Sequence, residues 1–169
     1  NNEFKVFIDN GSSILEKGSP DLPQLSTSII VPDNMGMKIN IINVEYDEYT
    51  DISIAPSKGN ITRDINPSSI PFTYNDSYDK NEFYPGPIAK LESPYILRDL
   101  RGQSVIFYPI QYNPITKTMR VYSKIDIEIV SYDNSLESNV LSRNSNFIKT
   151  SNEFMQIYND LFINSNSDT

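Results

Sequence analysis

The sequence predicts a mainly β fold: an antiparallel β-sandwich followed by one C-terminal amphipathic α-helix. Two observations support this prediction. Runs rich in β-branched and aromatic residues are separated by Pro, Gly and Asn, and near the C-terminus the apolar period changes to that of a helix. A chain of 169 residues is long enough to bury a core. We therefore expect a single domain, with the sandwich at about 1–132, a polar connector at 133–146 and the helix at about 151–163.

The N-terminal part of the chain contains four segments with the composition of β-strands. They are residues 4–8, 26–31, 37–49 and 51–55. In the longest of them, Met37, Ile39 and Ile41 share one face. A loop at 17–23 contains two prolines, which exclude regular structure there. The last of the four segments leads into an irregular stretch that is rich in turn residues.

A β-hairpin is predicted further along the chain. Residues 103–112 are apolar on both faces, which is typical of a strand buried on both sides. The segment 113–117 contains Pro114, whose fixed φ favours a turn. Residues 118–131 then alternate between apolar and polar side chains, as a half-buried antiparallel strand does.

The C-terminal helix is predicted from a stripe of large apolar residues at helical spacing. They are Phe154, Ile157, Tyr158, Leu161 and Phe162. Thr150, with Glu153 three residues later, predicts a capping box at the start of this helix. The stripe is expected to pack on the core, and it could also contact a partner domain. The Ser- and Asn-rich connector before it is expected to be mobile.

The composition excludes several classes of function. A net charge of −8 argues against nucleic acid as a partner, because a phosphate binder needs a basic stripe. The absence of Cys and His excludes thiolate or imidazole metal sites and a Cys or His nucleophile–base pair. Asp47, Glu48 and Asp51 lack the spacing of a calcium loop. No apolar run approaches the length of a spanning helix. We therefore expect no cofactor, no metal, no membrane insertion and no catalysis.

One irregular segment, residues 55–67, carries two cations in an otherwise acidic chain: Lys58 and Arg63. Prolines at positions 56 and 67 restrict its ends, which lowers the entropy lost on docking. A guanidinium suits a carboxylate in a protein pocket, whereas Lys58 beside Gly59 also fits a simple turn. An exposed irregular segment is also a site where proteases cut. Arg63 is therefore either a docking residue, with Lys58 as the alternative, or a solvated loop charge.

Two further features have a structural and a functional interpretation. Arg98, Asp99 and Arg101 form a dense charge cluster that either contacts a partner or, as the composition favours, ties an internal turn. Phe154 and Tyr158 of the helical stripe are the other candidate partner contacts. The 11 tyrosines would suit a carbohydrate-binding module or a surface adhesin, although strands are generally rich in Tyr and the chain has no Trp.

Four long segments resemble the N-terminal prodomain of gingipain-type cysteine proteases, and the segment 154–164 matches in pattern. The four read "EKGSPDLPQLSTSIIVP" (16–32), "IAPSKGNITRDINP" (54–67), "FYPGPIAKLESPYILRDLRGQ" (83–103) and "YPIQYNPITKTMRVY" (108–122). The resemblance covers nearly the whole chain from about Ser12 onward. It implies a β-sandwich that assists folding of a cysteine protease catalytic domain and keeps it latent until proteolysis removes the prodomain.

The resemblance also implies a role for particular residues and a location. In arginine-specific members of the family, a basic residue on a prodomain loop enters the specificity pocket and is also a processing site. Arg63 falls on that position, so the implied processing bond is Arg63–Asp64. The family is secreted, first to the periplasm and then to the cell surface or the medium. The alternative function remains an adhesin or carbohydrate-binding β-sandwich.

Overall fold

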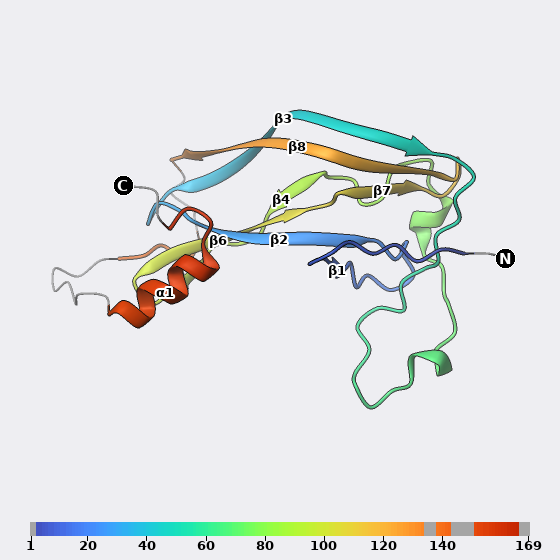
Figure 1. Cartoon of the computed structure of the whole chain (residues 1–169), viewed down its shortest axis with the longest axis horizontal. Helices are drawn as coiled ribbons and strands as arrows, with labels where there is room; N and C mark the ends of the chain where they lie inside the picture. The colour runs from blue at the N-terminus through green and yellow to red at the C-terminus, as the bar shows by residue number, and fades with distance from the viewer. Residues whose placement is uncertain (1–2, 134–137, 143–150, 166–169) are drawn as a thin grey trace. The chain divides into compact units, whose positions relative to one another are not determined.

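The computed structural model describes residues 3–133, 138–142 and 151–165, and it contains two β-sheets (Figure 1). In the first sheet the strand order is β1 (Ser12–Ser13), β2 (Pro23–Ile30), β6 (Leu100–Phe107) and β4 (Ala89–Leu91), with β5 (Tyr95–Leu97) also paired to β6. In the second sheet the order is β3 (Gly36–Tyr49), β8 (Thr118–Tyr132) and β7 (Ile110–Asn113). Two 3₁₀ turns, η1 (Pro67–Ser69) and η2 (Asp76–Asp79), precede β4, and helix α1 (Asn152–Leu161) ends the described chain. The predicted antiparallel two-sheet β fold with one C-terminal helix is confirmed.

The chain forms two compact units. Unit 1 comprises Asn1–Leu25, Ile42–Ile88 and Phe107–Asp126, and unit 2 comprises Ser26–Ile41, Ala89–Ile106 and Ile127–Thr169. The segment with the two loop cations belongs to unit 1, whereas the charge cluster and α1 belong to unit 2. Within residues 3–133, 138–142 and 151–165, no helix has the length and apolar character needed to cross a membrane.

The core of unit 1 combines aliphatic side chains with tyrosines whose hydroxyls bond the backbone. Leu22, Ile54, Ile110 and Tyr112 form its buried centre. The Tyr112 hydroxyl donates to the carbonyl of Ile52 at 3.0 Å, and the hydroxyl of half-buried Tyr78 donates to that of Ile54 at 2.8 Å. Burial raises the pKa of both phenols, so both stay protonated as donors. The backbone around 52–54 thereby gains partners without a continuous strand.

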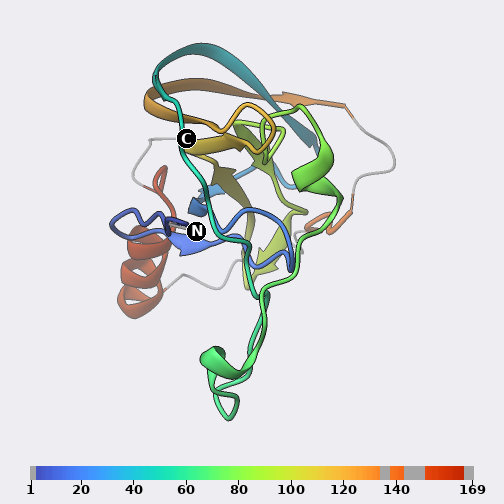
Figure 2. The same cartoon turned by 90° about the vertical axis from the view of Figure 1, so that its right-hand side faces the viewer.

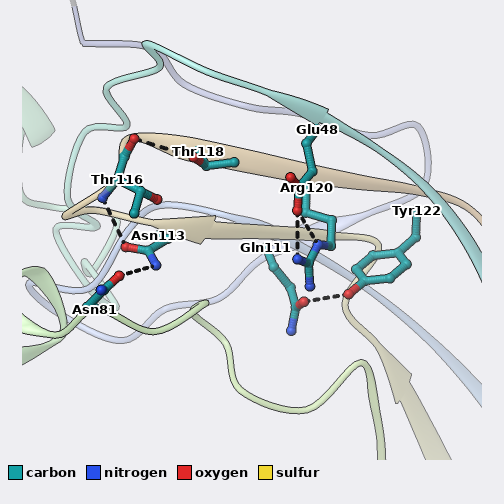
Figure 3. Close-up of polar contacts among 8 residues, drawn as sticks. All are labelled: Glu48, Asn81, Gln111, Asn113, Thr116, Thr118, Arg120 and Tyr122. Carbon is teal, nitrogen blue, oxygen red and sulfur yellow. Dashed lines mark hydrogen bonds and ion pairs between the residues drawn. The ribbon is translucent and has the colours of Figure 1, made fainter.

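The predicted hairpin is confirmed as the β7–β8 pair, with Ile110 opposite Val121 and Asn113 opposite Thr118. The Asn113 side chain holds the turn: its Oδ1 accepts from the amides of Ile115 and Thr116, at 3.0 and 3.2 Å. Figure 3 shows this side chain between the turn and a neighbouring loop, where its Nδ2 donates to Asn81 Oδ1 at 2.9 Å.

The strand expected over 103–112 is instead two strands that belong to different sheets. β6 ends at Phe107 and β7 begins at Ile110. Between them, Pro109 has no N–H to donate to a ladder. The Tyr108 amide donates instead to the Ile88 carbonyl at 2.8 Å, and the Pro109 carbonyl accepts from Tyr122 N at the same distance. A single proline thus moves the chain from one sheet to the other.

The strands expected at 4–8 and 51–55 are reduced to an isolated bridge between Phe4 and Ile54. Asp51 adopts a positive φ of 58°, which interrupts an extended strand at its start. Pro56, which has no N–H, forms an isolated antiparallel bridge with Pro20 and does not continue the pairing with the segment of Phe4. The segment 51–55 and the residue after it thus pair with two different partners through single bridges, and no strand forms there.

In unit 2, the residues just after helix α1, which Figure 1 shows in red, pack against the first sheet. Phe162, just after the helix, is 1% exposed, and its ring stacks on Tyr95 of β5 with centroids 6.4 Å apart. The Asn164 side chain donates to and accepts from the backbone of Ile30, at 3.0 and 2.8 Å. These contacts fasten the end of the helix to β2.

The start of α1 differs from the predicted capping box. The helix begins at Asn152, so the residue at the cap is Ser151, and Thr150 lies outside the described residues. The Ser151 side chain accepts no capping hydrogen bond. The pKa of the Glu153 carboxyl is lowered by its own backbone N–H and then by the Ser151 hydroxyl. Most of the connector expected at 133–146 also lies outside the described residues.

Gly102 on β6 provides a test of how α1 is held. A Cβ at this position would lie 2.7 Å from ring atoms of both Phe162 and Tyr95, closer than packed atoms approach. We expect Gly102→Ala to separate the two rings and to cost about 1–3 kcal/mol of unfolding free energy. Urea denaturation measures the cost, and hydrogen exchange should speed up in 152–161. The matched control is Gly86→Ala, where a Cβ meets nothing within 4 Å. Equal stability of the two variants would contradict this packing.

Candidate functional site

The candidate site is the basic loop, defined here as residues 57–75 of unit 1, and both of its ends bond the same short segment. Ser57 donates its amide to the Ser19 carbonyl at 2.7 Å, and its carbonyl accepts from the Gly18 amide at 2.9 Å. At the other end, the Asn75 amide donates to the Gly18 carbonyl at 3.0 Å, and the Asn75 Nδ2 donates to Ser19 Oγ at 2.8 Å. Figure 2 shows the loop, in green, projecting from the strands of its unit.

The tip of the basic loop is a turn that presents Arg63. The Ile65 amide donates to the Thr62 carbonyl at 3.1 Å, which places Arg63 and Asp64 at the two central positions. Both central side chains are exposed. A hydrogen bond from the Thr62 hydroxyl, and then one from its own amide, lowers the pKa of Asp64. The carboxylate therefore stays charged and helps to hold the turn.

The second cation of the loop points back into it. Lys58 Nζ donates to the Pro67 carbonyl at 2.7 Å and lies 4.5 Å from the centre of the Phe72 ring. Asn66 caps η1 by accepting from the Ser68 amide at 3.0 Å, so the carbonyl that Lys58 bonds is held in a short helix. The sequence left Arg63 and Lys58 as alternatives. The structure gives Lys58 contacts within the loop and leaves Arg63 exposed at the tip.

The charge cluster between β5 and β6 makes contacts inside unit 2. Arg98 adopts a positive φ of 58°, and its guanidinium lies 3.9 Å from the centre of the Phe154 ring. Asp99 accepts a hydrogen bond from the Tyr158 hydroxyl. Burial, followed by this bond to a carboxylate, raises the pKa of Tyr158 to about 12. The turn thus binds α1 through two residue pairs.

Arg101 is the most deeply buried charge of the cluster, with 1% of its surface exposed. Its Nη1 donates to the carbonyls of Pro32 and Met35 at 2.7 and 2.8 Å. Its Nε and Nη2 donate to those of Asn139 and Ser138 at 2.9 and 3.0 Å. The Arg101 side chain is therefore buried inside unit 2, where it binds four backbone carbonyls.

Helix α1 buries only part of its apolar stripe. Tyr158 is 3% exposed, so it is also internal, whereas Phe154, Ile157 and Leu161 are 36%, 49% and 40% exposed. Met155 adds to this surface, at 45%. We name the group of Phe154, Met155, Ile157 and Leu161 the exposed helix face.

Arg120 of unit 1 forms an ion pair that the sequence indicates only through the alternation of apolar and polar residues along its strand. Arg120 of β8 donates to Glu48 Oε1 from Nε and Nη2, at 3.1 and 2.6 Å (Figure 3). Its guanidinium also lies 4.4 Å from the Tyr46 ring centre and 4.0 Å from that of Phe83. The alternation pattern placed Arg120 on the polar side of the strand. Contact with two aromatic rings, together with the ion pair, explains how it is held there.

A pocket of about 440 Å³ in unit 1 is lined by acidic, basic and aromatic residues. The lining includes Glu16, Asp76, Lys80, Glu82 and Tyr84, and the Tyr84 hydroxyl donates to Glu16 Oε2 at 3.0 Å. Among the described residues, no group of three or more acidic side chains is placed to hold a metal ion. The charged groups of the pocket are therefore not arranged as a metal site.

Comparison with known proteins identifies the class of this domain. The family model Propeptide_C25 matches residues 4–162. Gingipain R2 of Porphyromonas gingivalis is 43% identical over 155 residues, which are 91% of this chain and 20% of that protein. Gingipain R1 of the same species is 43% identical over 154 residues, 91% of this chain and 15% of that protein. The chain thus spans a fifth or less of the length of these relatives.

A solved structure agrees with the sequence comparison. It is described as a complex of the Porphyromonas gingivalis RgpB pro- and mature domains, and it matches with a TM-score of 0.78 and 42% identity over 93% of this chain and 78% of that chain. A structure of gingipain K from the same organism matches in fold, with a TM-score of 0.62 and 21% identity over 75% of this chain and 73% of that one. The molecule is therefore a non-catalytic propeptide. It belongs to the Propeptide_C25 family, the gingipain-type propeptides, and the resemblance found in the sequence is confirmed.

Arg101 provides a stability test of the internal role of the charge cluster. Arg101→Met removes the donors of four backbone carbonyls, and we expect a loss of roughly 3–5 kcal/mol in unfolding free energy. Arg101→Lys should also destabilise, because a compact ammonium does not reproduce the guanidinium fork. Arg98→Met, at an exposed position in the turn before β6, should cost less than about 1 kcal/mol. Urea denaturation compares the three variants. A small effect at Arg101 would mean that these bonds contribute little.

Proposed function

We propose that this domain keeps a gingipain-type cysteine protease latent by placing Arg63 in the specificity pocket of the catalytic domain until proteolysis removes the prodomain. The observation that carries the proposal is the exposed Arg63 at the tip of a loop whose two ends are fixed on one segment. The RgpB prodomain, which this chain matches closely, was solved with its mature domain, which supports a catalytic domain as the partner.

The chemistry of Arg63 suits a pocket that ends in a carboxylate. A guanidinium presents a planar fork of donors that fits a carboxylate with two parallel hydrogen bonds. The turn at 62–65 and the fixed loop ends limit the conformations of the free domain, so less entropy is lost on docking. Lys58 is the weaker candidate for the pocket, because its ammonium already donates to the Pro67 carbonyl.

The same turn is the proposed processing site, at the Arg63–Asp64 bond. Within the part of the chain that the structure describes, the other arginines make internal contacts: Arg98 lies over Phe154, Arg101 is buried, and Arg120 pairs with Glu48. An arginine-specific protease therefore finds Arg63 the easiest of these to reach. The proposal extends to assistance in folding of the catalytic domain and to secretion through the periplasm to the cell surface or the medium, in line with the family.

The proposal predicts how variants of Arg63 inhibit the mature domain of RgpB. Arg63→Ala removes the ion pair and leaves the pocket carboxylate unpaired, which should cost about 2–5 kcal/mol of binding, or roughly 30- to 4,000-fold in the inhibition constant. Arg63→Lys should lose less, since the charge remains while the fork is lost. Mass spectrometry of the products should find the cut after Arg63 in the parent domain and no cut there in Arg63→Ala.

The control for this experiment is Lys5→Ala, another exposed cation of unit 1. Its inhibition constant should equal that of the parent domain. If Arg63→Ala inhibits as well as the parent, the specificity pocket is not where this loop binds. If no variant, nor the parent domain, inhibits the mature domain at all, latency is not the function and the adhesin or carbohydrate-binding alternative gains support.

We also propose that the exposed helix face contacts the catalytic domain. Each of its four apolar side chains is at least 36% exposed, and burying such apolar surface is favourable. Phe154, held under Arg98, would be its most fixed member. The residues of this contact belong to unit 2, whereas the basic loop belongs to unit 1.

The helix contact predicts a loss of affinity without a loss of fold. Replacing both Ile157 and Leu161 by Gln keeps good helix formers and removes two half-exposed apolar side chains. At about 1 kcal/mol each, inhibition of the RgpB mature domain should weaken roughly 30-fold. Circular dichroism should be unchanged. Ile115→Gln, at a site 54% exposed in the β7–β8 turn, is the control and should inhibit normally. Unchanged inhibition by the double variant would show that α1 makes no such contact.

A further inference from the structure

A second set of contacts joins the two arms of the basic loop, closer to its tip than the hydrogen bonds that fix its ends. Lys58 leaves the base on the first arm of the loop, and the atoms that it contacts, the Pro67 carbonyl and the Phe72 ring, lie on the second arm. The contact therefore joins two segments of the chain that are not paired as β-strands. It divides the loop into a closed base and a tip of residues 59–66.

We propose that Lys58 is a positioning residue: it ties the two arms of the basic loop together and so fixes the direction in which the turn presents Arg63. This inference rests on the proposed docking of Arg63, but the bracing itself does not. An ammonium suits the role because it offers three donors and a point charge, which satisfy a carbonyl and the face of an aromatic ring together.

The receiving atoms are themselves fixed. Pro67 begins η1, its carbonyl also accepts from the Ile70 amide at 3.3 Å, and Asn66 caps the turn from the preceding position. The brace thus connects Lys58 to an ordered turn instead of to a free segment of chain. Gly59, with a φ of 79°, lets the chain bend directly after Lys58, where its backbone packs beside Lys17.

The tip needs such a brace because little else holds it. Residues 62–69 are all exposed, so almost no apolar burial opposes their disorder. Without the Lys58 contact, the free part of the loop would grow from the eight residues of the tip to the whole segment between Ser57 and Asn75. A freer tip would dock more weakly, since more conformations are lost on binding. It would also be cut more readily, because proteases act on segments that open locally.

The two effects of a freer tip define the experiment. Lys58→Met removes the ammonium and retains an unbranched apolar side chain, and Lys58→Arg retains a donor and a cation over the ring. The matched control is Lys5→Met. Trypsin, followed by mass spectrometry of the fragment that begins at Asp64, measures the cutting rate with no docking involved, because this new end forms whether or not the chain is also cut after residue 58. Inhibition of the RgpB mature domain measures docking, and a thermal melt checks that the domain stays folded.

We expect Lys58→Met to be cut after Arg63 at least threefold faster than the parent and to inhibit about three- to tenfold more weakly, a loss well below that of Arg63→Ala. Lys58→Arg should restore both values, and the melting temperature should be the same throughout. Lys58→Met cut at the parental rate would overturn the brace. Normal inhibition by Lys58→Met, beside a large loss for Arg63→Ala, would overturn its role in positioning.

The failure of docking and the failure of the brace give different results. If Arg63 does not dock, Arg63→Ala inhibits normally while Lys58→Met is still cut faster, so the brace stands and the docking does not. If Lys58 is itself the pocket residue, Lys58→Met loses as much inhibition as Arg63→Ala was expected to lose, and the cutting rate is unchanged. That pattern would overturn the positioning role.

Discussion

The candidate site depends on the close approach of Ser57 and Asn75 to Gly18 and Ser19. Gly18 makes this approach possible: its φ is 87°, and a Cβ there would lie 3.0 Å from Asn75. Closing a loop of this length has an entropic cost that its exposed tip does not offset. The hydrogen bonds at the base offset it, and they connect the loop to the tyrosine-rich core through Tyr78, which follows Asn75 closely. Every property proposed for the tip assumes this closed base.

Each unit uses a cation to bind backbone carbonyls that lie outside the β-strands. Lys58 bonds the Pro67 carbonyl in unit 1, and Arg101 bonds four carbonyls in unit 2. Carbonyl groups outside β-strands have no hydrogen-bond partner on a neighbouring strand. A charged donor forms a stronger hydrogen bond with them than a neutral donor does. The chain has only 14 Lys and Arg, so their placement at such points is informative. Arg63 differs from both because its side chain is exposed at a turn.

The sequence predicted the features that depend on local pattern. The β7–β8 hairpin and the helical stripe of α1 follow from spacing, and both are present. The change of sheet at Pro109 could have been suspected from the missing N–H, but the apolar run around it suggested one strand. The partners of Arg101 could not be predicted, because they lie between 37 and 69 residues away in the chain. The brace at Lys58 was missed because the segment read as a simple turn.

The base of the basic loop is built mainly from main-chain groups. Ser57, Gly18 and Asn75 meet through amides and carbonyls, and Lys58 bonds a carbonyl as well. Thr62 and Asp64 hold the turn at the tip, but the base closes through other groups, so the identity of the residue at position 63 does not affect how the loop closes. Such a loop is exchangeable: a different residue at the tip would present a different chemical group on the same support. The residue that we propose for recognition and the backbone that carries it are thus free to change independently.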